Sequence, residues 1–236
     1  MATTMTKKKS KKKLVPVMDT SLFELDAGIG NEEVTQDDLA LPFLKLLQVS
    51  SQKSIKQLKA LGISASAGDV WNTVTNELYT DRKLRVIPAA YQRRFIEWTP
   101  RGDGNNAPVA IYTPDEKRPT TARNPEDNKD YTEGGQTYLE DTHHHYLLVL
   151  NDNGTTTSAL LTMKSTGLKK SRKWNSMIAS RVMTNDEGKV FSPPRFAHIY
   201  TLQVIEDGND EGEWFNWDVT LEGPVENADH YQEARQ

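Results

Sequence analysis

The strongest constraint on the fold lies where two apolar segments, HHYLLVLN (144–151) and TTSALLTM (156–163), flank Asp152-Asn153-Gly154. Asn-Gly accommodates the positive φ angles that tight hairpins require. Both flanking segments are rich in the aliphatic and β-branched residues that suit a pleated, half-buried surface. The sequence therefore predicts an antiparallel hairpin here, and a protein built around a sheet.

More segments of this kind occur on both sides of the hairpin. They are rich in Val, Ile, Thr and aromatic residues, several alternate apolar with polar, and they lie at 68–79, 83–91, 94–100, 195–206 and 213–223. Regular structure should begin near Leu41, because FLKLLQV (43–49) is a short apolar run that fits a strand or one helical turn. Residues 101–141 are instead rich in Gly, Pro, Asn, Asp and Thr, which predicts a long insertion between two strands.

One helix is predicted at about 166–182, with Ser165 or Thr166 at its start to accept free amide hydrogens. On a helical wheel one face holds Leu168, Trp174, Ile178 and Val182, and the opposite face holds Lys169, Arg172 and Lys173. About five core strands with one helix between successive strands is the layout of an oligonucleotide/oligosaccharide-binding (OB) barrel. The prediction is therefore a mainly β fold, an OB-like barrel with one amphipathic helix, a long insertion and flexible tails, and a β-sandwich is the alternative.

The 236 residues are long enough for one large domain with extensions. We expect a disordered basic tail and acidic linker at 1–34, one β-rich nucleic-acid-binding domain at 35–223, and an acidic tail at 224–236. The chain has no cysteine, which excludes disulfides and thiolate chemistry. No apolar run reaches the ~18 residues of a membrane span, and no signal-peptide core follows the first charges, so a cytoplasmic location is expected.

The net charge of −4 hides a sorting of charge along the chain. Residues 1–18 carry six Lys and no acid, and residues 19–40 carry seven acids and no base. Residues 41–204 carry 22 bases and 16 acids, whereas residues 205–236 carry one base and ten acids. A basic centre therefore lies between acidic flanks, which favours a polyanionic partner and makes the acidic end a candidate competitor for the basic surface.

Cations alternate with aromatic residues across the basic centre, as expected where phosphates meet cations and bases stack on rings. The predicted nucleic-acid-binding residues of the strands are Arg82, Lys83, Arg85, Tyr91, Arg93, Arg94 and Trp98. Those at and within the helix are Lys164, Lys169, Lys170, Arg172 and Lys173. A core role for any one aromatic residue, and a solvated helix face for the lysines, are the structural alternatives.

No catalytic constellation is visible in the sequence. It has no glycine-rich phosphate loop, no HExxH, no EF-hand pattern and no GxSxG. His143-His144-His145 resembles a metal cluster, but on a strand only His143 and His145 share a face, and a third ligand must come from elsewhere. We therefore expect no enzyme activity, no metal and no cofactor, and keep a metal-dependent nuclease as a third hypothesis.

The plan resembles that of bacteriophage single-stranded DNA-binding proteins, through segments 40–51, 83–98 and 158–178 and the acidic C-terminal region. The resemblance implies a barrel that binds single-stranded DNA without sequence specificity during phage replication or recombination, in the host cytoplasm, with replication or recombination proteins as partners. RNA and a homo-oligomer are compatible with it. The terminal aromatic residue of the best-known pattern is absent. The alternative is a virion structural or assembly protein whose basic tail contacts the genome.

Overall fold

The computed structural model describes all residues except 1–19, 36–37, 101–106 and 211. The chain divides into two compact units, Met1–Ala40 and Leu41–Gln236. The described part of the first unit contains one short helix, α1 (Thr20–Leu25). The tail predicted at 1–13 lies outside the described residues.

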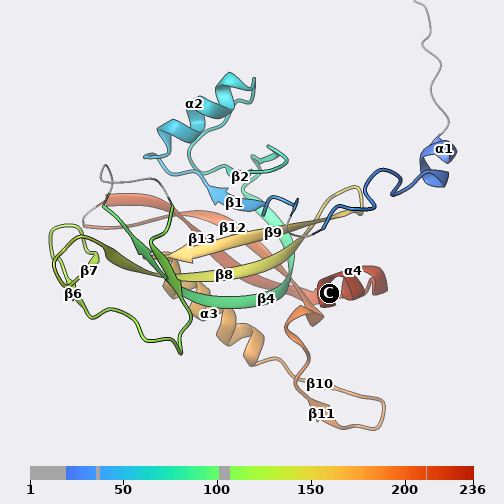
Figure 1. The fold of residues 1–236 in the computed structure, drawn as a ribbon. Helices are drawn as coiled ribbons and strands as arrows, with labels where there is room; N and C mark the ends of the chain where they lie inside the picture. The colour runs from blue at the N-terminus through green and yellow to red at the C-terminus, as the bar shows by residue number, and fades with distance from the viewer. Residues whose placement is uncertain (1–19, 36–37, 101–106, 211) are drawn as a thin grey trace, which may run out of the picture. The chain divides into compact units, whose positions relative to one another are not determined.

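The second unit is dominated by one sheet that curls into a half-barrel (Figure 1). Its continuous path has the order β13-β12-β4-β8-β9-β1-β2-β3. The strands on this path are β1 (Phe43–Leu46), β2 (Val70–Asn72), β3 (Leu78–Tyr79), β4 (Lys83–Trp98), β8 (Tyr138–Leu150), β9 (Thr156–Lys164), β12 (His198–Asn209) and β13 (Gly212–Pro224). The prediction of a mainly β fold of OB-like barrel type is confirmed.

The predicted hairpin is confirmed as β8 and β9, which pair antiparallel from Thr142↔Lys164 to Leu150↔Thr156. The backbone of Asn151 closes the turn, because its N–H donates to Thr155 O (2.9 Å) and its carbonyl accepts from Gly154 N (3.0 Å). Gly154 has a φ of +83°, a conformation that costs glycine little.

The two segments predicted at 83–91 and 94–100 form a single strand, β4, of 16 residues. The pairing of β4 with β8 shifts register between Pro88 and Ala90. Such an irregularity bends a strand and increases its twist, which helps the sheet to curl. A proline in mid-strand is tolerated at a bulge because it cannot donate a ladder hydrogen bond there.

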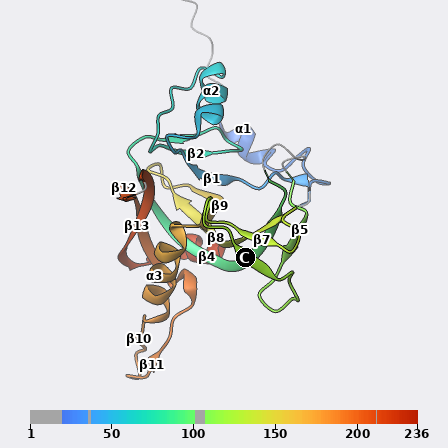
Figure 2. The same ribbon diagram turned by 90° about the vertical axis from the view of Figure 1, so that its left-hand side faces the viewer.

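Helix α3 (Gly167–Ala179) lies against the sheet (Figure 2) and contacts β8, β9 and β13. Its Trp174 belongs to one hydrophobic cluster with residues from β1, β2, β4, β8, β9, β12 and β13. Strands so far apart in the sheet contribute to one cluster only on the concave side of the curl, so α3 fills that side. The buried helix face is Gly167, Ser171 and Trp174. Val182, predicted on this face, is 65% exposed because the helix ends before it.

The opposite face of the sheet carries a second apolar cluster of Ile87, Leu148 and Ala234. Ala234 belongs to α4 (Ala228–Arg235), which begins at Asn227, whose side chain accepts from Asp229 N and His230 N. The predicted tail at 224–236 therefore differs from the structure. An N-cap and a buried alanine hold this segment as a helix despite its polar sequence.

A third cluster, Leu47, Leu58 and Trp71, joins α2 (Gln52–Ala60) to β1 and β2. The connection after β1 also reaches β13 through Gln48. Its side-chain amide donates to Phe215 O and accepts from Phe215 N, both at 2.8 Å. An amide side chain thus takes the place of a neighbouring strand at the edge of β13.

The predicted insertion at 101–141 falls between β4 and β8, but its residues from Tyr138 onward already belong to β8. It holds three short strands, β5 (Ala110–Tyr112), β6 (Thr121–Arg123) and β7 (Asp130–Thr132). A separate two-stranded arm of β10 (Met183–Thr184) and β11 (Val190–Phe191) follows α3 and leads to the short 3-10 helix η2 (Arg195–Ala197). Within the described residues, no helix is long and apolar enough to span a membrane.

We expect Trp174→Ala to lower the free energy of unfolding by about 3–5 kcal/mol, because it removes the largest fully buried side chain from the main core. Lys169→Ala is the matched control, since Lys169 is exposed on the same helix and its loss should change stability by less than about 0.5 kcal/mol. Urea unfolding followed by circular dichroism measures both. Equal losses in the two variants would contradict the packing role of Trp174.

Candidate nucleic-acid interface

Two of the predicted strand cations are held by carboxylates. Arg85 forms a bidentate ion pair with Glu222. Arg93 donates to both oxygens of Asp141, at 2.9 and 2.7 Å, and its guanidinium lies over the Phe95 ring. Bidentate pairs of this kind are strong and geometrically fixed. A phosphate could bind these arginines only by competing with the carboxylates.

Most of the predicted helix cations are paired as well. The Nζ atom of Lys164 lies 3.0 Å from Glu140, that of Lys170 lies 3.5 Å from Asp207, and that of Lys173 lies 3.2 Å from Asp218. Arg172 is more exposed and lies 3.9 Å from Asp141. Lys169 is exposed, and the described part of the chain offers it no ion-pair partner.

The carboxylates come largely from the acidic C-terminal region. Asp207 lies on β12, and Asp218 and Glu222 lie on β13. The sorting of charge along the sequence therefore does not persist in space, because β12 and β13 bring acids onto the basic residues of α3 and β4.

The remaining predicted residues have structural contacts. Arg82 donates to Ala67 O and lies over the Phe215 ring, and Arg94 donates to Arg93 O and Gln92 Oε1. Trp98 is partly buried, and its indole N–H has no partner within the described residues. Lys83 is exposed. Tyr91 packs on the rings of His143 and His145, so it serves the core.

His143 and His145 share a face of β8, as predicted, and both contact Ser171 of α3. Ser171 Oγ lies 2.7 Å from His143 Nδ1 and 2.7 Å from His145 Nε2. His145 Nδ1 lies 3.3 Å from Nη2 of Arg195, which can only donate, so His145 carries its proton on Nε2 and donates to Ser171. Ser171 then donates to His143, whose Nε2 faces Asp141 Oδ1 at 3.7 Å. A directed chain of hydrogen bonds thus runs from Arg195 through His145 and Ser171 to His143.

The Ser171 hydroxyl occupies the position between His143 and His145 that a metal ion would need. A serine hydroxyl, and not a third ligand, bridges the two histidines. Among the residues that the structure describes, no group of three His, Cys, Asp or Glu side chains is placed to hold a metal ion. Ser171 is completely buried, so the Ser171–His143 contact lies out of reach of a substrate.

A different set of cations forms no ion pair with any described carboxylate. Between Asp38 and Asp69 the chain has four lysines and no acid. The four are Lys45 on β1 and Lys53, Lys56 and Lys59 on α2. All four are exposed, and no described carboxylate forms an ion pair with any of them. We call them the α2 lysines. The sequence analysis missed them because it counted charge over residues 41–204 as one block, whereas a finer count reveals them.

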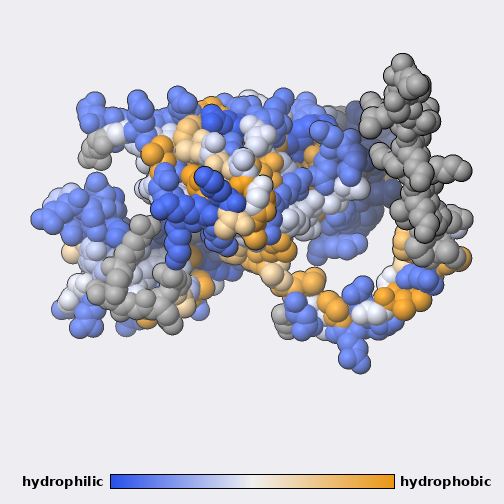
Figure 3. All heavy atoms as spheres, turned by 90° about the horizontal axis from the view of Figure 1, so that it is seen from above, coloured by the Kyte–Doolittle hydropathy of each residue, from blue (hydrophilic) through white to orange (hydrophobic). Residues whose placement is uncertain are grey.

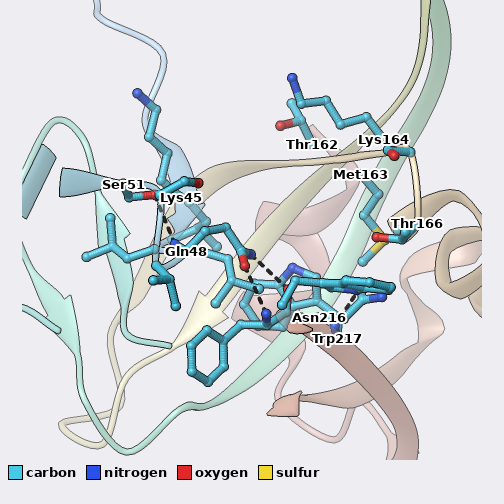
Figure 4. A pocket seen from close by; sticks show the side chains of 18 of the residues that line it. Lys45, Gln48, Ser51, Thr162, Met163, Lys164, Thr166, Asn216 and Trp217 are labelled. Atoms are coloured by element: carbon cyan, nitrogen blue, oxygen red, sulfur yellow. Dashed lines mark hydrogen bonds between the residues drawn. The ribbon is translucent and has the colours of Figure 1, made fainter. Parts of the chain in front are cut away.

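Of the α2 lysines, Lys45 lines a groove of about 760 Å³ that is formed by residues 44–51, 54, 161–167 and 213–217, and helix α2 contributes Ser54 to the same groove. Figure 4 shows Lys45 and Lys164 extending on the same side of the groove, away from Asn216 and Trp217. Trp214 and Phe215 of β13 are partly buried in its wall. The indole N–H of Trp214 is buried and has no partner in the described structure. Lys45 also lies 5.5 Å above the Trp71 ring.

The surface on the α2 side contains both hydrophobic and hydrophilic residues. Figure 3 looks down on this side and shows hydrophobic surface bordered by hydrophilic surface. Hydroxyl groups of Ser50, Ser51, Thr162 and Thr166 line the groove between the lysines and the aromatic wall. Cations, hydroxyls and rings in one groove can hold phosphates and bases together.

Comparison with known protein families identifies a phage family. The family model described as Pam3 phage gp34-like protein matches residues 9–236. No curated protein and no solved structure matches the chain.

Acidification should destabilise the fold through the buried histidines. Burial, and after it the charge of Arg195, lowers the pKa of His145 well below its ordinary value of 6.5, and burial also lowers the pKa of His143. The unfolded chain therefore takes up protons below pH 6.5 that the folded chain does not. Each such histidine should cost up to about 1.4 kcal/mol per pH unit.

Urea unfolding between pH 8 and pH 5 measures this loss, which should begin near pH 6.5 and be absent above about pH 7.5. His145→Gln should reduce the slope by one histidine's share. A wild-type stability that stays flat from pH 7 to pH 5 would contradict neutral buried histidines.

Proposed function

We propose that this chain, which belongs to the Pam3 phage gp34-like protein family, binds single-stranded DNA without sequence specificity during phage DNA replication or recombination. It acts in the host cytoplasm as a binding protein and not as an enzyme. The observation that carries the proposal is Lys45 in a groove with an aromatic wall, together with the unneutralised lysines of helix α2, whose Ser54 also lines that groove.

The α2 lysines favour phosphate binding because no ion pair must first be broken. A lysine that meets a phosphate releases condensed counterions from the nucleic acid, and this release supplies most of the affinity of nonspecific binding. Lys53, Lys56 and Lys59 follow one another at every third position of α2, so they spread along one side of the helix. Such a row suits the regular spacing of phosphates along a strand.

The groove supplies the second half of the recognition. Trp214 and Phe215 offer rings, and base–aromatic stacking is worth about 1–3 kcal/mol per base whatever the base. Neither stacking nor lysine–phosphate contact reads the edge of a base, which agrees with binding of many sequences. RNA offers the same phosphates and bases, so this mode of binding accommodates it as well.

The predicted cations of β4 and α3 have a secondary role in this proposal. Lys169 and Arg172 are exposed and can extend the positive surface. Arg85, Lys170 and Lys173 are occupied by Glu222, Asp207 and Asp218. In this proposal, these carboxylates would compete with phosphates for the three cations.

Two triple variants with the same change of charge separate the two surfaces. Lys53→Ala, Lys56→Ala and Lys59→Ala together should weaken binding to oligo-dT by about tenfold or more near 0.1 M salt, and should reduce the salt slope by about two. Arg85→Ala, Lys170→Ala and Lys173→Ala together should change both far less, because each of these cations already has a carboxylate partner and none lines the groove. Quenching of tryptophan fluorescence across a salt titration measures both quantities.

The result shows which surface binds the strand, and whether the chain binds single-stranded DNA. If the second triple variant loses as much affinity as the first, the binding surface is the one predicted from the sequence. If neither wild type nor variants bind oligo-dT with a steep salt dependence, the chain is not a single-stranded DNA-binding protein.

A virion structural or assembly role is the second candidate, and the β10–β11 arm favours it. Val182 and Val190 are exposed on this arm, at 65% and 62%, as are Met183 and Phe191. An isolated two-stranded hairpin is marginally stable in water, so apolar residues on it favour contact with another protein. Deleting residues 1–13 separates the candidates, because it should abolish DNA binding under the assembly role and only reduce it under the proposed function.

A further inference from the structure

The β10–β11 arm exposes apolar side chains on both of its faces. Met183 pairs with Phe191 across the two strands, so these side chains share one face, whereas Val190 pairs with Thr184 and lies on the other face. The exposed fractions are 62% for Val190, 42% for Phe191 and 37% for Met183. Both faces of the arm are therefore open to a partner.

The tip of the arm is a fixed acidic turn. Asn185 Oδ1 accepts hydrogen bonds from the backbone N–H of Glu187 at 3.1 Å and of Lys189 at 2.9 Å. The N–H of Asn185 donates to Lys189 O at 3.0 Å and closes the turn. Asp186 and Glu187 lie on this turn, are exposed, and form no ion pair with any described base. A turn held in this way loses little conformational freedom when a partner binds it.

The groove between β1, β9 and β13 has chemistry that complements the arm. Val49 in this groove is 65% exposed, and Trp214 and Phe215 are partly buried in the β13 wall. Lys45 lines the groove and forms no ion pair with any described carboxylate, and the other α2 lysines follow on the adjoining helix. Apolar side chains beside unpaired lysines match an arm that has an apolar stem and an acidic tip.

The arm points away from the groove of its own chain. Figures 1 and 2 view the second unit from two sides about one vertical axis, and both show α2 at one end and the β10–β11 arm at the other. The complementary groove that this arm can enter is therefore that of another copy of the chain.

We infer that the β10–β11 arm of one copy docks in the groove of a second copy, with Asp186 and Glu187 against the α2 lysines and Phe191 against the aromatic wall. The contact is head-to-tail, since each bound pair keeps one free arm and one free groove, and such contacts build rings or open chains. A single hairpin makes a small interface, below about 1,200 Å², so the association should be weak and should depend on concentration.

The docking does not depend on the proposed function, but the two share the groove. A DNA strand that binds in the groove as proposed competes with the arm of the neighbouring copy. Self-association would then lower the number of grooves that are open to DNA, and DNA would dissociate the assembled chains.

Sedimentation of the full chain without DNA, from about 10 µM to 1 mM, tests the docking. The average mass of the wild type should rise with concentration. Asp186→Lys with Glu187→Lys forms the arm variant, and Lys45→Glu with Lys53→Glu forms the groove variant. Each variant alone should associate about tenfold or more weakly than the wild type, because like charges then meet across the contact. An equal mixture of the two variants should associate again, because each arm then meets a groove of opposite charge.

Two further variants complete the test. Phe191→Ser should also weaken association, because it removes an apolar contact and leaves the acidic tip unchanged. Lys83→Glu with Lys169→Glu is the matched control, since both lysines are exposed and lie outside the arm and the groove, and it should associate like the wild type.

The inference is overturned if the wild type stays monomeric at the highest concentration, or if the mixture of variants fails to restore association. It is also overturned if the arm variant loses association and the groove variant keeps it, because the arms would then pair with each other. Oligo-dT tests the shared groove separately: it should return the wild type to monomers, whereas a chain that associates but does not bind oligo-dT contradicts the proposed function and leaves the docking standing.

Discussion

The fold depends on what α3 places inside the curled sheet. Trp174 stacks on His145 at 4.6 Å and meets Tyr200 edge-on, while Ser171 one turn earlier bridges His143 and His145. The tryptophan gives the helix its apolar anchor. The serine gives it a fixed rotation, because its hydroxyl must lie between two imidazoles. A sheet of this curvature would expose its concave side without such a helix, and the positions of the basic residues around it follow from this anchor.

The positions of the carboxylates, more than the number of cations, decide which surfaces of this protein keep unpaired positive charge. The sequence places most bases in the centre and most acids at the end, which suggests a positive core beside a negative tail. In the fold, β12 and β13 run beside the centre, and their acids meet Arg85, Lys170 and Lys173. The cations that remain unpaired are those whose neighbours in space are not acidic, and sequence order alone does not identify these neighbours.

Local patterns predicted local structure well. The Asn153-Gly154 turn fixed the β8–β9 hairpin, and the apolar face at Leu168 and Trp174 located α3, because turn conformation and helix period are decided by near neighbours. Features that depend on tertiary packing were harder to predict from the sequence. The bulge at Pro88 joins two predicted strands into β4, and the helix α4 depends on the burial of Ala234. Neither has a strong signal in the surrounding residues.

The difference between local patterns and tertiary features also explains why the predicted binding residues and the unpaired lysines are different residues. Cation and ring composition predicted positive surfaces, but composition does not tell whether an arginine such as Arg93 faces a carboxylate or open solvent. The lysines of α2 differ from it in one physical respect, since the whole stretch from Asp38 to Asp69 lacks acids. An absence of acids over this stretch removes competition from sequence neighbours only. Acids of distant strands can still neutralise a base, as Asp207 and Asp218 do at Lys170 and Lys173. A free positive surface in this fold therefore needs both an acid-free segment and acid-free neighbours in space.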